Sequence, residues 1–244
     1  MMLLLSGEGP SDIGTCDQAV AECEGGNFKA GPMALLIDQI VTPVWNYSPK
    51  DTMAFVFVSE GVVATKARQI RRMVFPGLKQ ARETGGFFNH ARALAQMAKA
   101  RETPQLSVGA VLFRDSDGTC SAPNSLWQEK WSAIMRGFTA ENFEFGVPMV
   151  PKPKSEVWLL CALQEQPYAN CARFEAISGN DASPNSAKKQ LDEALKARGN
   201  EHRDVWDMIE NGTIQAAMIQ MPSFDCFHER LVKVARMMRG LPDG

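Results

Sequence analysis

The sequence predicts an α/β protein with a mostly parallel sheet flanked by helices and a helical C-terminal section. Short, continuously apolar runs recur along the first 150 residues, which is typical of strands covered on both faces. Segments with helical periodicity separate these runs. From Ser155 onward the pattern is helical only.

The elements follow in chain order. The expected strands are the apolar runs 2–5, 53–58, 108–113 and 145–150. The expected helices are a segment opened by Pro32, a long helix over 77–101, a helix over 125–138 and a helix over 187–198. For the last of these, Ser183 is the expected N-cap and Pro184 the first helical residue. Residues 13–31 are expected to form a loop.

Length and composition place the chain among ordinary globular proteins. Its 244 residues, 45% of them hydrophobic, fit one large domain or two small ones. We expect a core over 1–165 and a helical section over 166–244 packed on it, or a single domain over 1–244. The formal net charge of −2 shows none of the basic surplus typical of nucleic-acid binders, although a local basic patch remains compatible with it.

The cysteines and the apolar segments bear on location. The six cysteines are scattered without a Cys-x-x-Cys pair, and three histidines argue against a structural zinc site. We expect free thiols in a reducing cytosol. The apolar run at residues 1–5 is too short for a signal peptide, and no run approaches the roughly 18 apolar residues of a membrane helix. The prediction is a cytoplasmic protein without a membrane segment.

Acidic residues accompany the apolar runs at three places far apart in sequence. Glu8 follows the first run in a turn containing Gly7 and Gly9, Asp115 and Asp117 follow the run at 108–113, and Glu156 precedes another apolar segment. Open α/β sheets hold ligands beyond the carboxyl ends of their strands. Carboxylates gathered there would suit one or two Mg²⁺ or Mn²⁺ ions.

The pair Asp115 and Asp117 carries most of this hypothesis. In extended geometry, residues two apart point the same way, so the carboxylates repel each other and each raises the pKa of the other. Arg114 is expected on the opposite face, which leaves a divalent cation as the economical counter-charge. The alternative is a pair of solvated turn residues.

The other acids have alternatives too. Glu8 could be a solvated turn residue, and Glu156 could simply complement a helix dipole. Asp12 is expected to cap the following segment rather than to bind metal.

Two motifs resemble the TOPRIM fold of topoisomerases, primases and related nucleases. These are Glu8-Gly9-Pro10-Ser11-Asp12 after a strand, and Asp115-Ser116-Asp117 after a later strand. The chain looks closest to TOPRIM-like proteins of bacterial defence loci, relatives of the overcoming-lysogenization-defect nucleases. Those share a Glu-x-Trp-Leu-Leu-like helix start, here Glu156–Leu160, and a Ser/Pro/Lys-rich stretch, here Ser183–Lys189. The resemblance covers about the first 190 residues. Ser6-Gly7 and the roughly one hundred residues between the motifs depart from the pattern, the latter implying insertions.

The resemblance implies a nuclease that cleaves phosphodiester bonds in DNA or RNA with Mg²⁺ or Mn²⁺. Glu8, Asp115 and Asp117 would be catalytic. The two aspartates would bind metal, and Glu8 would bind metal or act as the general base for the attacking water. Glu156 would complete the ligand set, and Lys188 would stabilise transition-state charge. Resembling proteins are often encoded beside an ATPase and act as effectors in anti-phage defence. Because the chain lacks a nucleotide-binding loop, that ATPase would be a separate partner. A homo-oligomer is compatible with the sequence.

Two alternative functions stay open. Asp115-Ser116-Asp117-Gly118-Thr119 also spells the signature of the haloacid dehalogenase superfamily, in which Asp115 would be a phosphoryl-accepting nucleophile and Asp117 the acid/base. That motif normally lies near the N-terminus, and this alternative leaves Glu8 without a role. The other alternative is a non-catalytic, TOPRIM-like scaffold subunit.

Arg68, Arg71 and Arg72 are the candidate nucleic-acid contacts. Their i, i+3, i+4 spacing would place them on one helical face, where they could follow a phosphate backbone. The alternative is a solvated basic surface.

Overall fold

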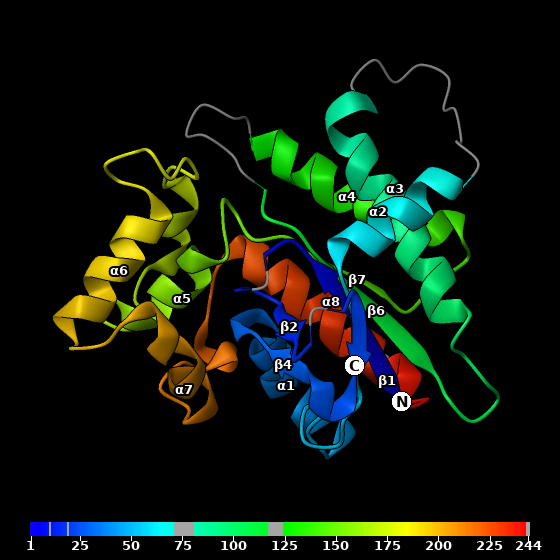
Figure 1. The fold of residues 1–244 in the computed structure, drawn as a ribbon. Coiled ribbons are helices and arrows are strands. Elements are labelled where there is room, and N and C mark those ends of the chain that lie inside the picture. The colour runs from blue at the N-terminus through cyan, green and yellow to red at the C-terminus, as the bar shows by residue number, and fades with distance from the viewer. Residues whose placement is uncertain (10, 19, 71–80, 117–123, 243–244) are drawn as a thin grey trace.

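The fold is an α/β structure built on a five-stranded, mostly parallel sheet (Figure 1). It is seen in a computed structural model that describes residues 1–9, 11–18, 20–70, 81–116 and 124–242. The strand order is β3-β5-β1-β6-β7, with all neighbours parallel except β3, which runs antiparallel to β5. The strands are β1 (Met2–Gly7), β3 (Glu22–Glu24), β5 (Phe55–Val58), β6 (Val108–Phe113) and β7 (Gly146–Met149).

Helices cover both faces of this sheet. They are α1 (Pro32–Trp45), α2 (Glu60–Gln69), α3 (Ala81–Lys99), α4 (Asn124–Ala140), α5 (Glu156–Leu163), α6 (Ala187–Ala197), α7 (Val205–Glu210) and α8 (Pro222–Met238). The described residues also form the short 3₁₀ helices η1 (Gly25–Asn27), η2 (Cys171–Ala176), η3 (His202–Asp204) and η4 (Ala216–Met218). Figure 1 shows α2, α3 and α4 together on one side of the sheet, with α1 and α8 on the other.

The alternation of side chains along β1 explains the two layers. Leu3 and Leu5 are buried in the cluster that contains α1, α5 and α8, whereas Leu4 is buried in the cluster that contains α2, α3 and α4. Both faces of the strand are therefore apolar, as the continuous run in the sequence predicted. The predicted fold class, an α/β sheet flanked by helices, is confirmed.

The segment predicted as a loop at 13–31 contains short strands. β2 (Gly14–Cys16) pairs with β4 (Phe28–Ala30) in a small antiparallel sheet, and β3 adds to the edge of the main sheet. Gly14 has a positive φ of 125°, and a Cβ there would lie 2.3 Å from the carbonyl oxygen of Lys29. Strands of three residues carry no recognisable alternation, so only their tertiary partners define them.

The C-terminal helices share their hydrophobic core with the sheet. Figure 1 shows α5, α6 and α7 grouped to one side, whereas α8 returns and packs on α1 and β7. Trp158 of α5 stacks on Phe227 of α8, with ring centroids 5.6 Å apart. The predicted boundary between 1–165 and 166–244 stays a prediction, and the buried cluster runs across it.

One predicted helix start is wrong. α6 begins at Ala187 and its N-cap is Ser186, whose hydroxyl accepts from the N–H of Lys189 at 3.3 Å. Ser183 and Pro184 lie before this cap, in a turn closed by the N–H of Ser186 donating to the Ser183 carbonyl. The serine three residues later therefore takes the capping position.

Within the described part of the chain, no helix is long and apolar enough to cross a membrane.

Candidate functional site

The carboxyl ends of β1 and β6 bring Glu8 and Asp115 together. The two strands are parallel neighbours, and Gly7 is in register with Phe113. The chain leaves β1 toward β5 on one side and returns as β6 on the other, so this rim is a topological switch point, where open α/β sheets hold ligands. The main-chain N–H of Asp115 donates to Glu8 Oε1 at 2.8 Å.

Two glycines shape the turn that carries Glu8. A Cβ on Gly7 would lie 2.8 Å from Cβ of Phe113, so the close approach of β1 and β6 at this point requires glycine. Gly9 has a positive φ of 78°, and its carbonyl accepts from the N–H of Asp12 at 3.2 Å. This turn reverses the chain, so that Asp12 also reaches the strand rim.

Asp12 belongs to the acidic site, contrary to the expectation that it caps the following segment. Its Oδ1 accepts from the Ser155 hydroxyl at 2.5 Å. The main-chain N–H of the same serine donates to Asp115 Oδ1 at 3.0 Å. Ser155 is buried just before α5 and therefore links the two carboxylates. Neither Ser155 nor the site position of Asp12 was predicted from the residues themselves.

Glu156 is the first residue of α5, and its charge helps to raise the pKa of Asp115 in the same cluster. One interaction of its carboxylate is with its own main-chain N–H, which fits an acid at a helix N-terminus. Its Oε2 is buried without a hydrogen-bond partner among the described residues. An interaction with the helix dipole therefore does not fully explain Glu156, because one buried oxygen of its carboxylate still lacks a hydrogen-bond partner among the described residues.

Burial disfavours the charged form of the carboxylates, and for Asp115 and Glu156 neighbouring acids add to this effect. Burial, followed by Asp12, Glu156 and Glu8, raises the pKa of Asp115 well above its usual range. Burial also raises the pKa of Asp12, against the hydrogen bond from Ser155. The pKa of Glu156 is raised by burial and by Asp12, although Lys154 opposes the shift. Among the described residues, the site is thus a cluster of acids whose charged forms are disfavoured by their surroundings.

The donor chemistry fits a hard divalent cation, but the ligand set is not gathered in the described residues. A divalent ion would satisfy carboxylates whose pKa values are raised by burial, together with the one buried oxygen of Glu156 that lacks a hydrogen-bond partner. Among the residues placed by the structure, however, no three His, Cys, Asp or Glu side chains form a group that could hold an ion. Asp117, a predicted ligand, lies outside the described residues.

Arg114 occupies the opposite side of Glu8 from this cluster. Its side chain projects away from Asp115, as expected, toward α2 and α3. Its guanidinium contacts Glu60 Oε1 at 2.6 Å, Nδ1 of His90, and Glu8 Oε2 at 3.5 Å. His90, which has no recognisable metal spacing in sequence, is thus part of the polar network beside the site.

The predicted basic residues lie further out. Lys188 is exposed in the first turn of α6, and no hydrogen bond or ion pair joins it to the described acids. Two other lysines are nearer. Lys130 of α4 donates to the carbonyl of Ser116, and Lys154 contacts Asp181 Oδ1 at 3.0 Å while lowering the pKa of Asp12 and Glu156.

Arg68 is exposed near the end of α2, and its charge helps to lower the pKa of His90. Arg71 and Arg72 lie outside the described residues. Since α2 ends at Gln69, the described helix does not extend to them, and the shared helical face stays a prediction.

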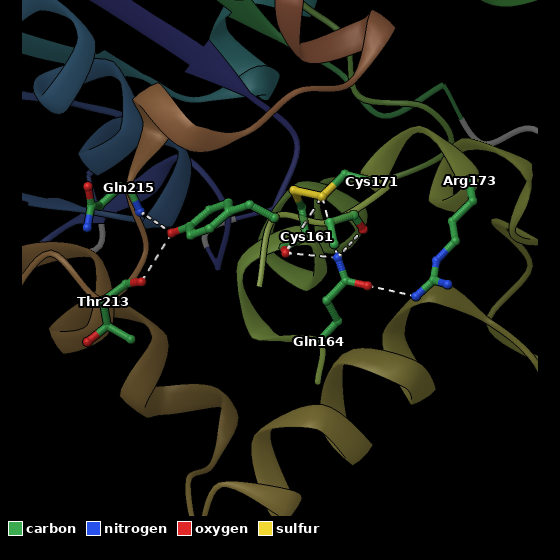
Figure 2. Close-up of a disulfide and its surroundings, with 8 residues drawn as sticks. Cys161, Gln164, Cys171, Arg173, Thr213 and Gln215 are labelled. Atoms are coloured by element: carbon green, nitrogen blue, oxygen red, sulfur yellow. Dashed lines mark hydrogen bonds between the residues drawn. A yellow bond between two sulfur atoms is a disulfide. The ribbon is translucent and has the colours of Figure 1, made fainter. Parts of the chain in front are cut away.

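A disulfide holds the far end of α5. Figure 2 shows Cys161 bonded to Cys171, with Gln164 beside the bond and its Oε1 accepting from Arg173 at 2.7 Å. Both sulfurs are buried. The helix that presents Glu156 at its first turn is therefore fixed covalently at its last one.

The prediction of free thiols is wrong for four cysteines. Cys16 and Cys23 form a second disulfide, in the segment that follows the Glu8 turn. Cys226 is free and exposed, and Cys120 lies outside the described residues. Disulfides are typical of oxidising compartments, so the reducing cytosol is no longer supported by the cysteines, and the cytoplasmic location stays a prediction.

Comparison of the chain with models of protein families, with curated proteins and with solved structures gave no match. The function must therefore be inferred from the residues and geometry of the acidic site.

Proposed function

We propose that this protein is a divalent-metal-dependent nuclease that cleaves phosphodiester bonds in DNA or RNA. One observation supports the proposal above the others. Glu8, Asp12, Asp115 and Glu156 are spread over about 150 residues but lie near one another at the switch point of a mostly parallel sheet. Burial raises the pKa values of Asp12, Asp115 and Glu156, and neighbouring acids raise those of Asp115 and Glu156 further. A cluster of buried acids whose charged forms are disfavoured is typical of a site that binds a cation.

In this proposal Glu8, Asp115, Asp117 and Glu156 hold the ion, and Asp12 joins them. When bound, one or two Mg²⁺ or Mn²⁺ ions supply a Lewis acid that polarises the phosphate and activates water. Ser155 keeps the carboxylates of Asp12 and Asp115 aimed into the site through its hydroxyl and its N–H. Burial of the cluster limits competing water and strengthens electrostatic interactions with the substrate phosphate.

A positive side chain near the scissile phosphate would stabilise the charge that develops in the transition state. Lys188 is the predicted residue, and its neighbour Lys189 is a matched control because its ammonium is engaged by the Ser183 carbonyl at 3.0 Å. If Lys188 has this role, Lys188→Ala lowers the cleavage rate by about 10²-fold with a smaller effect on binding, and Lys189→Ala does not. Equal losses of cleavage and binding would make Lys188 a plain phosphate contact.

The wider role that we propose is that of an effector in anti-phage defence, activated by a separate ATPase. A homo-oligomer is compatible with this role. If the chain were instead a scaffold, defence would survive Glu8→Gln. Loss of defence in that variant, with the protein still folded, supports the effector role.

A calorimetric titration with Mn²⁺ tests the proposal without substrate or partner. The variants are Glu8→Gln and Asp117→Asn, with Glu102→Gln as control, because Glu102 is exposed near the opposite end of β6. We expect both site variants to weaken binding by at least about 10-fold and the control to bind like the wild type. If only Asp117→Asn weakens binding, the phosphohydrolase with Asp115 as nucleophile becomes the better hypothesis. Wild-type protein that binds no Mn²⁺ contradicts the proposed function.

A further inference from the structure

We propose that Arg114 is the positioning residue that holds Glu8 at the acidic site, with Glu60 and His90 as its anchors. The inference rests on the proposed function, because it gives Glu8 the role of a fixed ligand. It also chooses between the two roles, metal ligand and general base, that a glutamate at this position could have.

The two oxygens of Glu8 are directed by two consecutive residues. Oε1 accepts the main-chain N–H of Asp115 at 2.8 Å, and Oε2 faces Nη1 of Arg114 at 3.5 Å. Because the side chains of residues 114 and 115 project to opposite sides of the chain, Glu8 lies between a cation and an acidic cluster. A carboxylate whose two oxygens are both held by neighbours is suited to act as a metal ligand. It is poorly suited to act as a general base, which must move as it accepts and releases a proton.

Arg114 is itself fixed from three elements. Only 9% of its side chain is exposed, so its geometry is set by its partners and not by solvent. Glu60, in the first turn of α2, accepts at 2.6 Å, and His90 of α3 accepts through Nδ1, because arginine can only donate. The planar guanidinium therefore links Glu60 of α2 and His90 of α3 to Glu8 at the end of β1, and fixes their relative positions.

The arrangement differs from a simple structural ion pair. Arg92 offers the comparison within the same chain: it is equally buried and contacts Glu141 at 2.6 Å. That pair joins α3 to the end of α4 and, among the described residues, involves none of the acids of the site. Arg114 is linked to a predicted ligand, so its loss should disturb ligand binding in addition to stability.

The test is a double-mutant cycle in the affinity for Mn²⁺, measured by calorimetry. We expect Arg114→Gln to weaken Mn²⁺ binding by about 10-fold, as is typical for partners of ligands. In a Glu8→Gln background, Arg114→Gln should have no further effect, because it acts through Glu8. Arg92→Gln, the matched control, should lower the melting temperature and leave Mn²⁺ affinity unchanged.

Two further variants keep the test informative if Arg114→Gln fails to fold. Glu60→Gln removes the charge of an anchor whose side chain is 45% exposed, so the fold should tolerate it. It should weaken Mn²⁺ binding in the same direction by a smaller factor, because the amide oxygen can still accept from Arg114. Arg114→Lys keeps the charge and should restore part of the affinity that Arg114→Gln removes.

The outcomes separate this inference from the proposed function. In one outcome, the wild type binds Mn²⁺ and Glu8→Gln weakens the binding, but the effects of Arg114→Gln and Glu8→Gln add in the double variant. This outcome overturns the role of Arg114 and leaves the proposed function standing. Unchanged affinity in Glu60→Gln and Arg114→Gln does the same. Wild-type protein that binds no Mn²⁺ overturns the proposed function and the inference with it.

Discussion

The main-chain N–H of Asp115 donates to the carboxylate of Glu8, 107 residues away in sequence, at 2.8 Å. This hydrogen bond joins the ends of the two central strands, and it places one acid from each strand at the same rim. The Asp115 side chain then turns to Ser155, so a single residue connects the turn after β1 with the start of α5.

Neutralising Asp115 should stabilise the protein in the absence of metal. Asp115→Asn keeps an oxygen that can accept from Ser155 and removes a charge that burial and three acids disfavour. We expect a gain of about 0.5–2 kcal/mol and a melting temperature a few degrees higher at pH 7, measured by calorimetry in EDTA.

The sign of the pH dependence is a check on that explanation. Because the folded-state pKa of Asp115 is raised, the wild type loses stability as pH rises from the ordinary carboxylate pKa through the folded one. The gain in Asp115→Asn should therefore vanish in acid, where both side chains are neutral. Asp51→Asn, at an exposed position, should show no gain. A lower melting temperature for Asp115→Asn would contradict the repulsion argument.

The position of Asp115 could be predicted from sequence because it depends on local pattern. An apolar run buried on both faces defines β6, and an acid directly after it must lie at the rim of a parallel sheet. The same reasoning placed Glu8 at this rim, where its carboxylate accepts from the N–H of Asp115. Helix α1 also followed from sequence, since Pro32 is its first residue.

Other site residues could not be predicted, because tertiary contacts alone define them. Asp12 reaches the site through a turn at Gly9 with positive φ, and Ser155 gains its role only when α5 docks beside β6. The partners of Arg114 come from two helices and a strand end, with no spacing that a single sequence reveals. The disulfides escaped prediction for the same reason, since cysteine pairing depends on distance in the fold.

His90 should make the protein less stable in mild acid. Burial, together with the charge of Arg114, lowers the pKa of His90 to about 4, although Glu60 opposes the shift. As pH falls from about 6.5 to about 4, the unfolded chain binds a proton that the folded protein excludes, so stability falls. Between pH 7.5 and 4.5, we expect a loss of about 1–2 kcal/mol attributable to His90, because solvent screens part of the effect at this partly buried side chain.

A comparison with His90→Gln isolates this contribution. The carboxylates titrate in both proteins, so their effects cancel in the difference between the two urea-unfolding free energies. That difference should shift against the wild type as pH falls. A difference that does not change with pH would show that His90 accepts a proton in the folded protein as readily as in the unfolded one.

The disulfide between Cys161 and Cys171 should contribute to stability. It closes a loop of about ten residues, for which the chain-entropy model gives about 2–3 kcal/mol. Replacing both cysteines by serine should lower the melting temperature by about 5–10 °C. Cys226→Ser, which removes the exposed free thiol, should leave the melting temperature unchanged. An unchanged melting temperature in the double variant would contradict a stabilising bond at this position.

The three predicted arginines should weaken nucleic-acid binding when removed together. Arg68 is exposed on α2, and its charge helps to lower the pKa of His90, which contacts Arg114 next to Glu8. A phosphate backbone that leaves the acidic site in this direction would meet Arg68. In Arg68→Ala/Arg71→Ala/Arg72→Ala, we expect lower affinity for duplex DNA. The slope of the logarithm of the binding constant against the logarithm of the salt concentration should become shallower by about 0.9 for each phosphate that is no longer neutralised. Arg203→Ala is the matched control, because its side chain is 80% exposed on η3. If the triple variant binds with the affinity and salt slope of the wild type, these arginines form a solvated basic surface and the substrate takes another path from the site.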